Sequence, residues 1–442
     1  MMKKLNILTL TLLYGVVLQL IYSHVISINF SYMGYVYLPV SMMQLLFAYT
    51  FAVIPALWMP VIITRPSQVV YWLLFVMVYV PAILVTVHTL PLPLEQILRF
   101  HASLFLSFGM LGLIYKVPLL SIPSVKMPAA CFWGFIFSLS LISYVFIFKA
   151  FGMSLSFVSL LNVYDVRSDY KEAAQQSSGL AAYLISWQAN VLNPLILGYG
   201  LKKKKLWMTA AALLGQGAIF SITGYKSVFF SGVLIMAILM AMYKHGKRFG
   251  YFTMAGAVGL IIIGWIAKAG FGSLIFSSLF VRRILITPGF LTGLYYDFFS
   301  SHEQVHLAHS IFKSFIDYPY SLNPPYLIGS YYFHSQEMSA NANIWADGFA
   351  NFGFWGLFIF PLLLGFILLL YDSVSEQKDL RVACLLIGIP AFSLTNTALL
   401  TGLLTHGLGL ALVIAYLIPG KRETETVLSA GSLENRQWDK SA

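Results

Sequence analysis

Apolar residues occur in runs of about 20 that recur from one end of the chain to the other, separated by short polar loops. A run of this length crosses a bilayer as a helix, because only a helix satisfies every backbone polar group within one segment. The pattern therefore predicts an all-α protein, a polytopic transmembrane helical bundle. The twelve expected spans are residues 6–26, 38–62, 69–89, 99–119, 129–149, 179–200, 206–222, 227–243, 251–269, 351–371, 382–400 and 403–419.

Two segments between these spans are longer than hairpin turns, at residues 150–178 and 270–350. The second contains the only long polar passage of the chain, and its pattern predicts an amphipathic surface helix over 300–315. Ser301 and Gln304 suggest a capping box for that helix. We expect residues 1–420 to form a single membrane domain. The tail at 421–442 is polar, lacks apolar periodicity and is expected to be disordered.

Composition agrees with a membrane protein and argues against a soluble one. Apolar residues make up 59% of the chain and charged residues only 10%, whereas a soluble domain carries roughly a quarter charged residues. The first apolar run follows Met-Met-Lys-Lys without a small-residue cleavage site, which predicts a retained span. Cys131 and Cys384 both fall inside apolar runs, where cysteine packs as a small apolar side chain.

The net charge of +11 does not indicate a nucleic-acid partner, because lysines and arginines lie mainly in short loops. Such loops set the orientation of a membrane protein, since basic residues stay on the cytoplasmic side. With a cytoplasmic N-terminus, 18 of the 27 basic residues fall inside. Both termini are therefore predicted to be cytoplasmic and both long loops extracytoplasmic.

The first candidate site residues are cationic. Arg282 and Arg283 follow the ninth expected span, and a guanidinium near a membrane is costly unless a partner is present. Its forked donors match phosphate, so a lipid diphosphate is one partner and snorkelling to ordinary lipid phosphates is the alternative. The pattern does not choose between the two arginines. Arg167 is a second phosphate candidate or pairs with carboxylates such as Asp165, and Lys226 ends a span where it either reaches the headgroup or snorkels.

The second group of candidates suits a sugar. Amides, carboxylates and aromatic faces bind sugar hydroxyls and rings. The alternative is a well-capped helix start, because Asn and Asp are good N-caps, and the tyrosines also suit an interfacial aromatic belt. The candidates are Tyr296, Asp297, Asn341, Asn343, Trp345, Asp347 and Asn351.

The run His302-Glu303-Gln304-Val305-His306 matches HExxH, which on a helix places two imidazoles on one face for zinc. His309 is expected on the same face. A third ligand at the metzincin spacing is missing, because Phe312 stands at that position. Solvated or substrate-binding histidines are the favoured interpretation over a membrane zinc protease, and no metal is expected.

Several motifs occur together in a recognisable order. They are LNVYDVRSDYKE, NPLILGYGL, FSITGYKSVFF, RRILITPGFLTGLYYDFFS, MSANANIWADGFANFGFWG and NTALLTGLLTHGL, and they cover roughly residues 160–410. With these motifs the chain resembles the Wzy-type polymerases, which join oligosaccharide repeat units of bacterial O-antigens and capsules.

The resemblance implies a GT-C-like membrane glycosyltransferase in the bacterial cytoplasmic (inner) membrane, with its active face extracytoplasmic. Such an enzyme transfers a growing glycan from undecaprenyl diphosphate onto a new lipid-linked repeat unit. It uses no cofactor and works beside a flippase and a chain-length regulator. By resemblance the external arginines would hold diphosphates. The base for the acceptor hydroxyl stays open among Asp165, His302, Glu303 and Asp347.

Two further functions remain open beside the polymerase and the zinc protease. An O-antigen ligase would share the fold and the lipid donor but transfer finished glycan to lipid A core. A polysaccharide transporter or flippase would also suit twelve spans. No half-to-half repeat is visible, however, and the polar residues gather in external loops instead of at mid-membrane.

Overall fold

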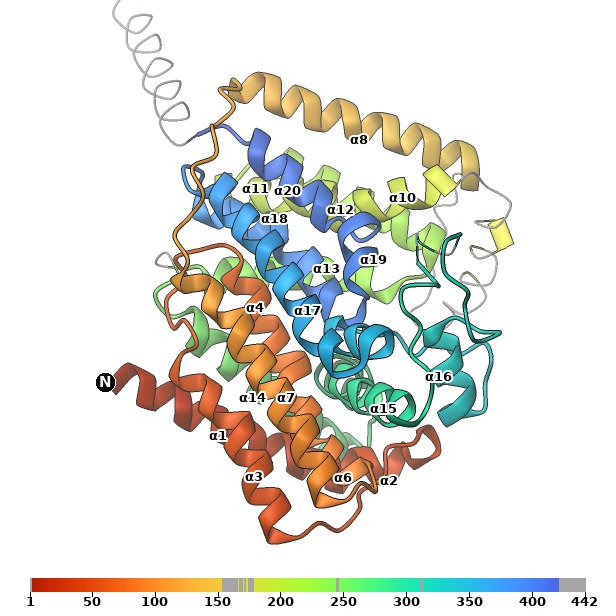
Figure 1. The fold of residues 1–442 in the computed structure, drawn as a ribbon. Helices are drawn as coiled ribbons and strands as arrows, with labels where there is room; N and C mark the ends of the chain where they lie inside the picture. The colour runs from red at the N-terminus through yellow and green to blue at the C-terminus, as the bar shows by residue number, and fades with distance from the viewer. Residues whose placement is uncertain are drawn as a thin grey trace, which may run out of the picture.

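The computed structural model describes residues 2–152, 166, 170, 172–173, 179–243, 246–310, 312 and 314–420 (Figure 1). Every regular element within these residues is a helix. The α-helices of the first half are α1 (Met2–Ile21), α2 (Ser27–Asn29), α3 (Met42–Val53), α4 (Gln68–Leu74), α5 (Val80–Leu84), α6 (Thr86–Thr89), α7 (Leu94–Leu113), α8 (Ala129–Phe151), α10 (Gly179–Trp187), α11 (Asn193–Lys203) and α12 (Leu206–Thr223). Those of the second half are α13 (Lys226–Ala241), α14 (Phe249–Phe271), α15 (Thr287–Ser301), α16 (Pro324–Phe333), α17 (Ile344–Ser375), α18 (Leu380–Ser393), α19 (Leu399–Leu404) and α20 (Leu408–Leu417). The predicted tail at 421–442 lies outside the described residues.

Nine helical segments of the described chain are long and apolar enough to cross a membrane. They are Leu5–Asn29, Gln68–Thr89, Leu94–Lys116, Ala129–Phe151, Gly179–Lys203, Leu206–Thr223, Phe249–Phe271, Ile344–Ser375 and Leu399–Leu417. The other three predicted spans coincide with shorter apolar helices, Met42–Leu57, Lys226–Ala241 and Leu380–Asn396. The protein is therefore a multi-pass helical membrane protein, and nine of the twelve predicted spans reach spanning length.

The loops that carry basic residues meet at one end of the bundle, where α1 begins and α20 ends (left in Figure 1). Lys202 pairs with Asp379 at 2.5 Å, which joins the α11–α12 turn to the α17–α18 turn. Arg65 donates hydrogen bonds to the carbonyls of Ile114 and Val117 after α7. The side of the membrane on which these loops lie stays a prediction.

The helix containing α4, a π-helical turn at Phe75–Tyr79, α5 and α6 runs through the middle of the bundle and is buried along nearly its whole length. Its rings stack on α7, with Tyr71 and Tyr79 each about 4.5 Å from the ring of Phe108. By contrast, α8 lies at the edge of the bundle, at the top of Figure 1. The core therefore forms around residues 68–89 and the helices that enclose them.

The segment 270–350 departs from the predicted external loop in its first half. A π-helical segment, Ser277–Ile286, continues into α15, and most of α15 is buried inside the bundle. A side chain at Gly289 would place its Cβ 2.3 Å from the backbone nitrogen of Ala82, so glycine permits α15 to touch α5. The polar residues of α15 hid this helix from a hydropathy pattern.

The predicted amphipathic helix over 300–315 is wrong. Helix α15 ends at Ser301, and His306 and Leu307 adopt positive φ angles of 45° and 64°. Tertiary hydrogen bonds replace the helical ones, since Val305 N donates to Ala350 O and Leu307 N to Asn351 Oδ1. The expected capping box is absent as well, because the Ser301 hydroxyl donates to the Phe298 carbonyl at the end of α15.

Residues 305–307 form these hydrogen bonds with α17 just before a break in that helix. Phe352 and Gly353 have non-helical backbone angles, and Gly353 has φ 55° and ψ −137°, a region open essentially to glycine. The two halves of α17 then touch through Gly348 and Gly356. A Cβ on Gly356 would lie only 1.7 Å from the Gly348 carbonyl oxygen.

We expect Gly356→Ala to destabilise the protein, because the new methyl group collides with backbone that cannot rotate away. The free energy of unfolding should fall by about 3 kcal/mol or more, measured as a lowered thermal midpoint in detergent. Gly259→Ala in α14 is the matched control, since nothing lies within 4 Å of that position. Equal midpoints for the two variants would contradict the contact between the halves of α17.

Candidate functional site

Arg282 lies in an aromatic enclosure formed by residues 30–35, in the connection that follows α2. Its guanidinium carbon is 4.7 Å from the ring centre of Phe30 and 5.8 Å from that of Tyr35. Nη1 reaches the Met33 sulfur at 3.5 Å, and Nη2 donates to Ser278 Oγ at 3.0 Å. Electron-rich ring faces and a thioether stabilise a cation without neutralising it.

The local backbone fixes this geometry. Thr287 directly follows the π-helical segment Ser277–Ile286, and its hydroxyl donates a hydrogen bond to the Arg282 carbonyl at 2.8 Å. The Tyr35 hydroxyl lies 2.8 Å from the same Thr287 oxygen, so the ring that faces the guanidinium is tied to the segment that carries it. Burial raises the pKa of Tyr35, and the nearby Arg282 charge only partly opposes this, so the phenol stays neutral.

No carboxylate among the described residues pairs with the Arg282 charge. Arg282 is only 6% exposed. Its Nε atom is buried and has no hydrogen-bond partner among the described residues. The ion pairs found among the described residues are Arg99–Glu95 and Lys202–Asp379, neither of which involves it. Burying an unpaired charge is expensive, so an anion from outside the described residues would stabilise the Arg282 guanidinium.

The structure separates the two adjacent arginines. Arg283 is exposed whereas Arg282 is buried, so they face different surroundings. Lys226 begins α13 and is half-buried; one turn later, the Phe230 ring lies 5.2 Å from Phe280 of the π-helical segment. Asp165 and Arg167 lie outside the described residues, so their predicted roles are not tested.

Asn343 joins α15 to α17. Its Oδ1 caps α17 by accepting from Trp345 N and Ala346 N, and its Nδ2 donates to Pro288 O and Thr292 Oγ1. This is the capped-helix alternative that the sequence left open. All four hydrogen bonds lie in the interior, so Asn343 positions the elements of the site, and its contact with a sugar stays a prediction.

The neighbouring polar residues are also bound within the protein. The Trp345 indole donates to Ser107 Oγ of α7 at 2.8 Å. Asp347 accepts from Asn351 Nδ2 with one oxygen and from Leu399 N, at the start of α19, with the other. These contacts hold the broken start of α17 against α7 and α19.

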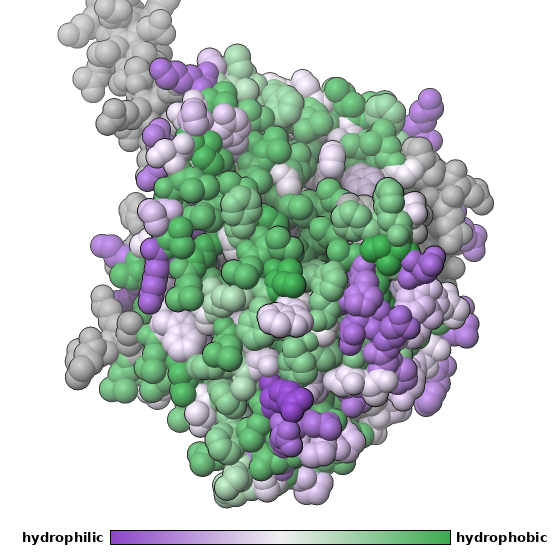
Figure 2. All heavy atoms as spheres, in the orientation of Figure 1, coloured by the Kyte–Doolittle hydropathy of each residue, from purple (hydrophilic) through white to green (hydrophobic). Residues whose placement is uncertain are grey.

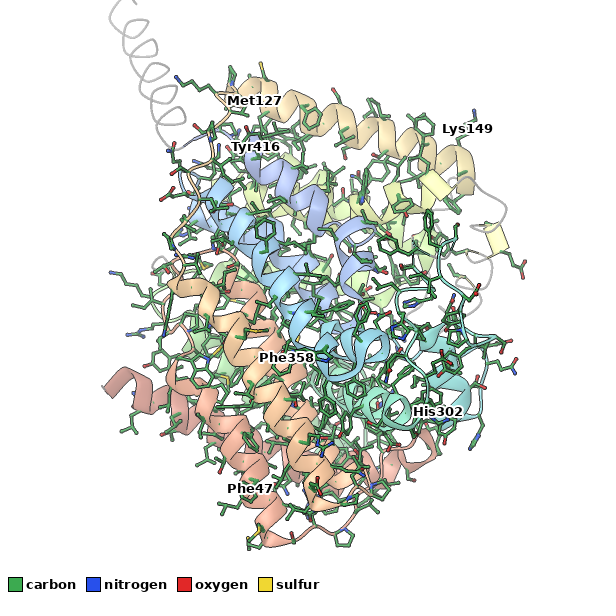
Figure 3. The ribbon with its side chains drawn as sticks, viewed as in Figure 1. Phe47, Met127, Lys149, His302, Phe358 and Tyr416 are labelled. Carbon is green, nitrogen blue, oxygen red and sulfur yellow. The ribbon has the colours of Figure 1, made fainter. Side chains whose placement is uncertain are left out.

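A second group of residues lies at the protein surface, in the segment that the sequence predicts to be extracytoplasmic. We call it the outer aromatic cluster: Phe298, His302, Tyr320, Tyr331 and Tyr332. His302 stacks on Phe298 at 4.0 Å, and the Tyr331 ring stands edge-on to Phe298 at 5.0 Å. Figure 2 shows hydrophilic surface gathered over α16 and its flanking loops, in a molecule that is otherwise mostly apolar on this face. Figure 3 places His302 on this side of the bundle.

Three predicted sugar-binding residues lie in or near this surface. Asp297 is half-buried and accepts the Tyr332 hydroxyl at 2.5 Å; burial, then this hydrogen bond and the carboxylate charge, raise the pKa of Tyr332. Asn341 is exposed, and its Oδ1 accepts from Ser339. Tyr296 is buried instead: it stacks on Phe100 at 4.3 Å and donates to Gln96 O.

A row of ring contacts runs from the arginine enclosure to the end of α16, the helix that carries Tyr331 and Tyr332. Tyr35, which faces Arg282, lies 4.5 Å from Phe290 of α15. Phe290 in turn lies 6.4 Å from Phe333 at the end of α16, two residues from Tyr331. The buried cation and the exposed rings therefore belong to one region at the same end of the bundle.

The HExxH interpretation loses its structural premise, because residues 302–306 are not helical. Among the described residues, no group of three His, Cys, Asp or Glu side chains is placed to hold a metal ion. His302 instead lies within hydrogen-bond distance of its own chain, with Nδ1 2.8 Å from Phe298 O. The HExxH spacing is therefore met by exposed histidine and glutamate residues of a non-helical surface segment.

Sequence analysis missed the residues that enclose Arg282, namely Phe30, Met33 and Tyr35. They lie about 250 positions away in the chain, in the passage NFSYMGYVY after the first span. Four aromatic residues in that short connection were the available signal. No protein-family model, curated protein or solved structure matches the chain.

The stabilities of Asn343→Ala and Asn341→Ala can be compared, because Asn343 is buried and hydrogen-bonded whereas Asn341 is exposed. We expect Asn343→Ala to lower the free energy of unfolding by about 2–4 kcal/mol, because it removes a helix cap and leaves buried partners unpaired. The exposed Asn341→Ala should change it by less than about 0.5 kcal/mol. Thermal unfolding of both purified variants in detergent gives the comparison, and an unchanged midpoint for Asn343→Ala would contradict its assigned role.

Proposed function

We propose that the protein is a polymerase of lipid-linked oligosaccharide repeat units, with a GT-C-like architecture and its active face outside the bacterial cytoplasmic membrane. The observation that carries the proposal is the buried guanidinium of Arg282, which pairs with no carboxylate of the described residues. A diphosphate on a membrane lipid is an anion that arrives at this depth. The resemblance of the motifs around Arg282 to Wzy-type polymerases supplies the reaction.

In this reaction a hydroxyl oxygen of the acceptor glycan attacks C1 of the donor sugar. The bond between C1 and the diphosphate oxygen breaks, and its electron pair leaves with undecaprenyl diphosphate. A cationic group beside that oxygen stabilises the charge as it develops, so no acidic proton donor is needed. Binding two lipid-anchored substrates at one face supplies much of the remaining rate enhancement. No cofactor is required.

The hydroxyl proton needs an acceptor, and the described residues narrow the candidates. Both oxygens of Asp347 already accept hydrogen bonds from within the protein, whereas His302 and Glu303 are exposed. With Nδ1 directed at the Phe298 carbonyl, His302 presents Nε2 to solvent as an acceptor. Asp165 remains a candidate on sequence grounds alone. A flippase would deliver the repeat units, and a chain-length regulator would act beside the polymerase.

Arg282→Met tests the proposal against a purely structural role. Methionine fills similar space without a charge, so we expect the thermal midpoint to stay equal or rise, because removing a buried ion in favour of an apolar group is often stabilising. Polymer formation should nevertheless fall by about 10²–10³-fold, the loss typical when a group that stabilises developing charge is removed. The measurement is the ladder of polymerised glycan on a gel, at matched protein levels.

Arg283→Ala is the matched control, because this neighbouring arginine is exposed, and we expect it to keep most of the polymer. Normal ladders from Arg282→Met would remove the diphosphate site from the mechanism. Two other outcomes would redirect the assignment. Long lipid-linked polymer that is never joined to lipid A core would indicate a ligase, and repeat units retained on the inner leaflet would indicate a flippase.

A further inference from the structure

One ring of the outer aromatic cluster is held in place and yet accessible. Tyr331 is 53% exposed, and the rings of Phe298 at 5.0 Å, Tyr332 at 4.9 Å and His302 at 5.8 Å stand nearly perpendicular to it. These neighbours fix the orientation of the Tyr331 ring, and more than half of the residue remains exposed. A ring fixed before a ligand arrives loses little conformational entropy on binding.

Polar groups surround this open ring in fixed orientations. His302 is stacked parallel to Phe298, with 6° between the planes, and its Nδ1 lies 2.8 Å from the Phe298 carbonyl oxygen. That contact assigns the proton to Nδ1 and leaves Nε2 as an acceptor. Tyr332 holds Asp297 through a hydrogen bond to Oδ2, and Tyr320 is anchored through its bond to the Glu303 carbonyl. Hydrogen-bond acceptors thus border a flat apolar face.

We infer that the outer aromatic cluster is a binding site for a sugar ring of the glycan, with Tyr331 stacking on the ring and His302 and Asp297 accepting its hydroxyl hydrogen bonds. An apolar face edged by acceptors is complementary to a pyranose, which has C–H groups on its faces and hydroxyls around its rim. The inference rests on the proposed function for the identity of the glycan. It adds where that glycan lies and which residues hold it.

The charges of the surface define the class of sugar further. Residues 297–341 contain four carboxylates, Asp297, Glu303, Asp317 and Glu337, against one basic residue, Lys313, which lies outside the described residues. Carboxylates repel an anionic sugar and accept from hydroxyls, so the site suits an uncharged sugar and disfavours a uronic acid.

The test uses the full-length protein in detergent and a lipid-free probe. The probe is the neutral oligosaccharide released by mild acid from the surface polysaccharide of the source strain, and binding is measured by titration calorimetry. We expect Tyr331→Ala to weaken binding about ten-fold, the loss of one good aromatic contact. Tyr331→Phe keeps the ring and should stay within about three-fold of the unaltered protein. His302→Ala, at a second exposed position, should also weaken binding.

Phe315→Ala is the control, because Phe315 is an 84% exposed aromatic residue of the same outer segment that is not part of the cluster. Binding equal to the unaltered protein in both Tyr331→Ala and His302→Ala would overturn the inference, as would equal loss in Phe315→Ala. An adsorbed sugar without defined stoichiometry would also overturn it.

Arg282→Met separates this inference from the proposed function. The probe lacks a diphosphate, so Arg282→Met should bind it normally even though polymer is lost. Normal ladders in Arg282→Met together with weak probe binding in Tyr331→Ala would leave a sugar site without the proposed polymerase chemistry. The opposite pair of results would leave the polymerase and remove the sugar site.

Discussion

The end of the bundle that contains Arg282 depends on one feature, a guanidinium group enclosed by two aromatic rings, a thioether and a hydroxyl. No carboxylate of the described residues pairs with it. Such a group is destabilising in an apolar interior, so the rest of the fold must hold it there. The π-helical turn, Thr287 and the Tyr35 hydroxyl do so by fixing both the arginine backbone and the ring that covers it. If Arg282 served packing alone, a carboxylate partner or an apolar residue in its place would give a more stable protein.

The membrane-spanning helices followed from the sequence because a bilayer imposes one simple rule, that a run of apolar residues must satisfy its backbone as a helix. The same rule fails where polar residues are buried against protein and not lipid. Helix α15 contains Thr292, Tyr295, Tyr296 and Asp297, so hydropathy placed it in an external loop, yet Gly289 lets it pack directly on α5. Tertiary contact decided its position.

Local periodicity also misled at residues 302–310. The apolar spacing there suits a helix, and a capping box was available, but Val305 and Leu307 find better partners in Ala350 and Asn351 at the break in α17. A break created by Gly353 some 50 positions later is invisible to any local pattern. Likewise, sequence could name Arg282 and Arg283 but not choose between them, because the choice is made by Phe30 and Tyr35 from the other end of the chain.

The predicted site residues divide by how fully their hydrogen-bonding groups are used. Asn343, Trp345, Asp347 and Asn351 are all of types that bind sugars, yet each is committed to a helix start, a neighbouring helix or the segment before α16. Arg282, His302 and Asp297 each keep a donor or acceptor that no described residue takes. Judged by residue type alone, all seven residues would be assigned to substrate binding. They are separated by whether a hydrogen-bonding group of the side chain remains without a partner among the described residues. The proposed polymerase would need both, since a rigid set of satisfied amides would keep the Arg282 cation and the exposed rings in place before substrate binds.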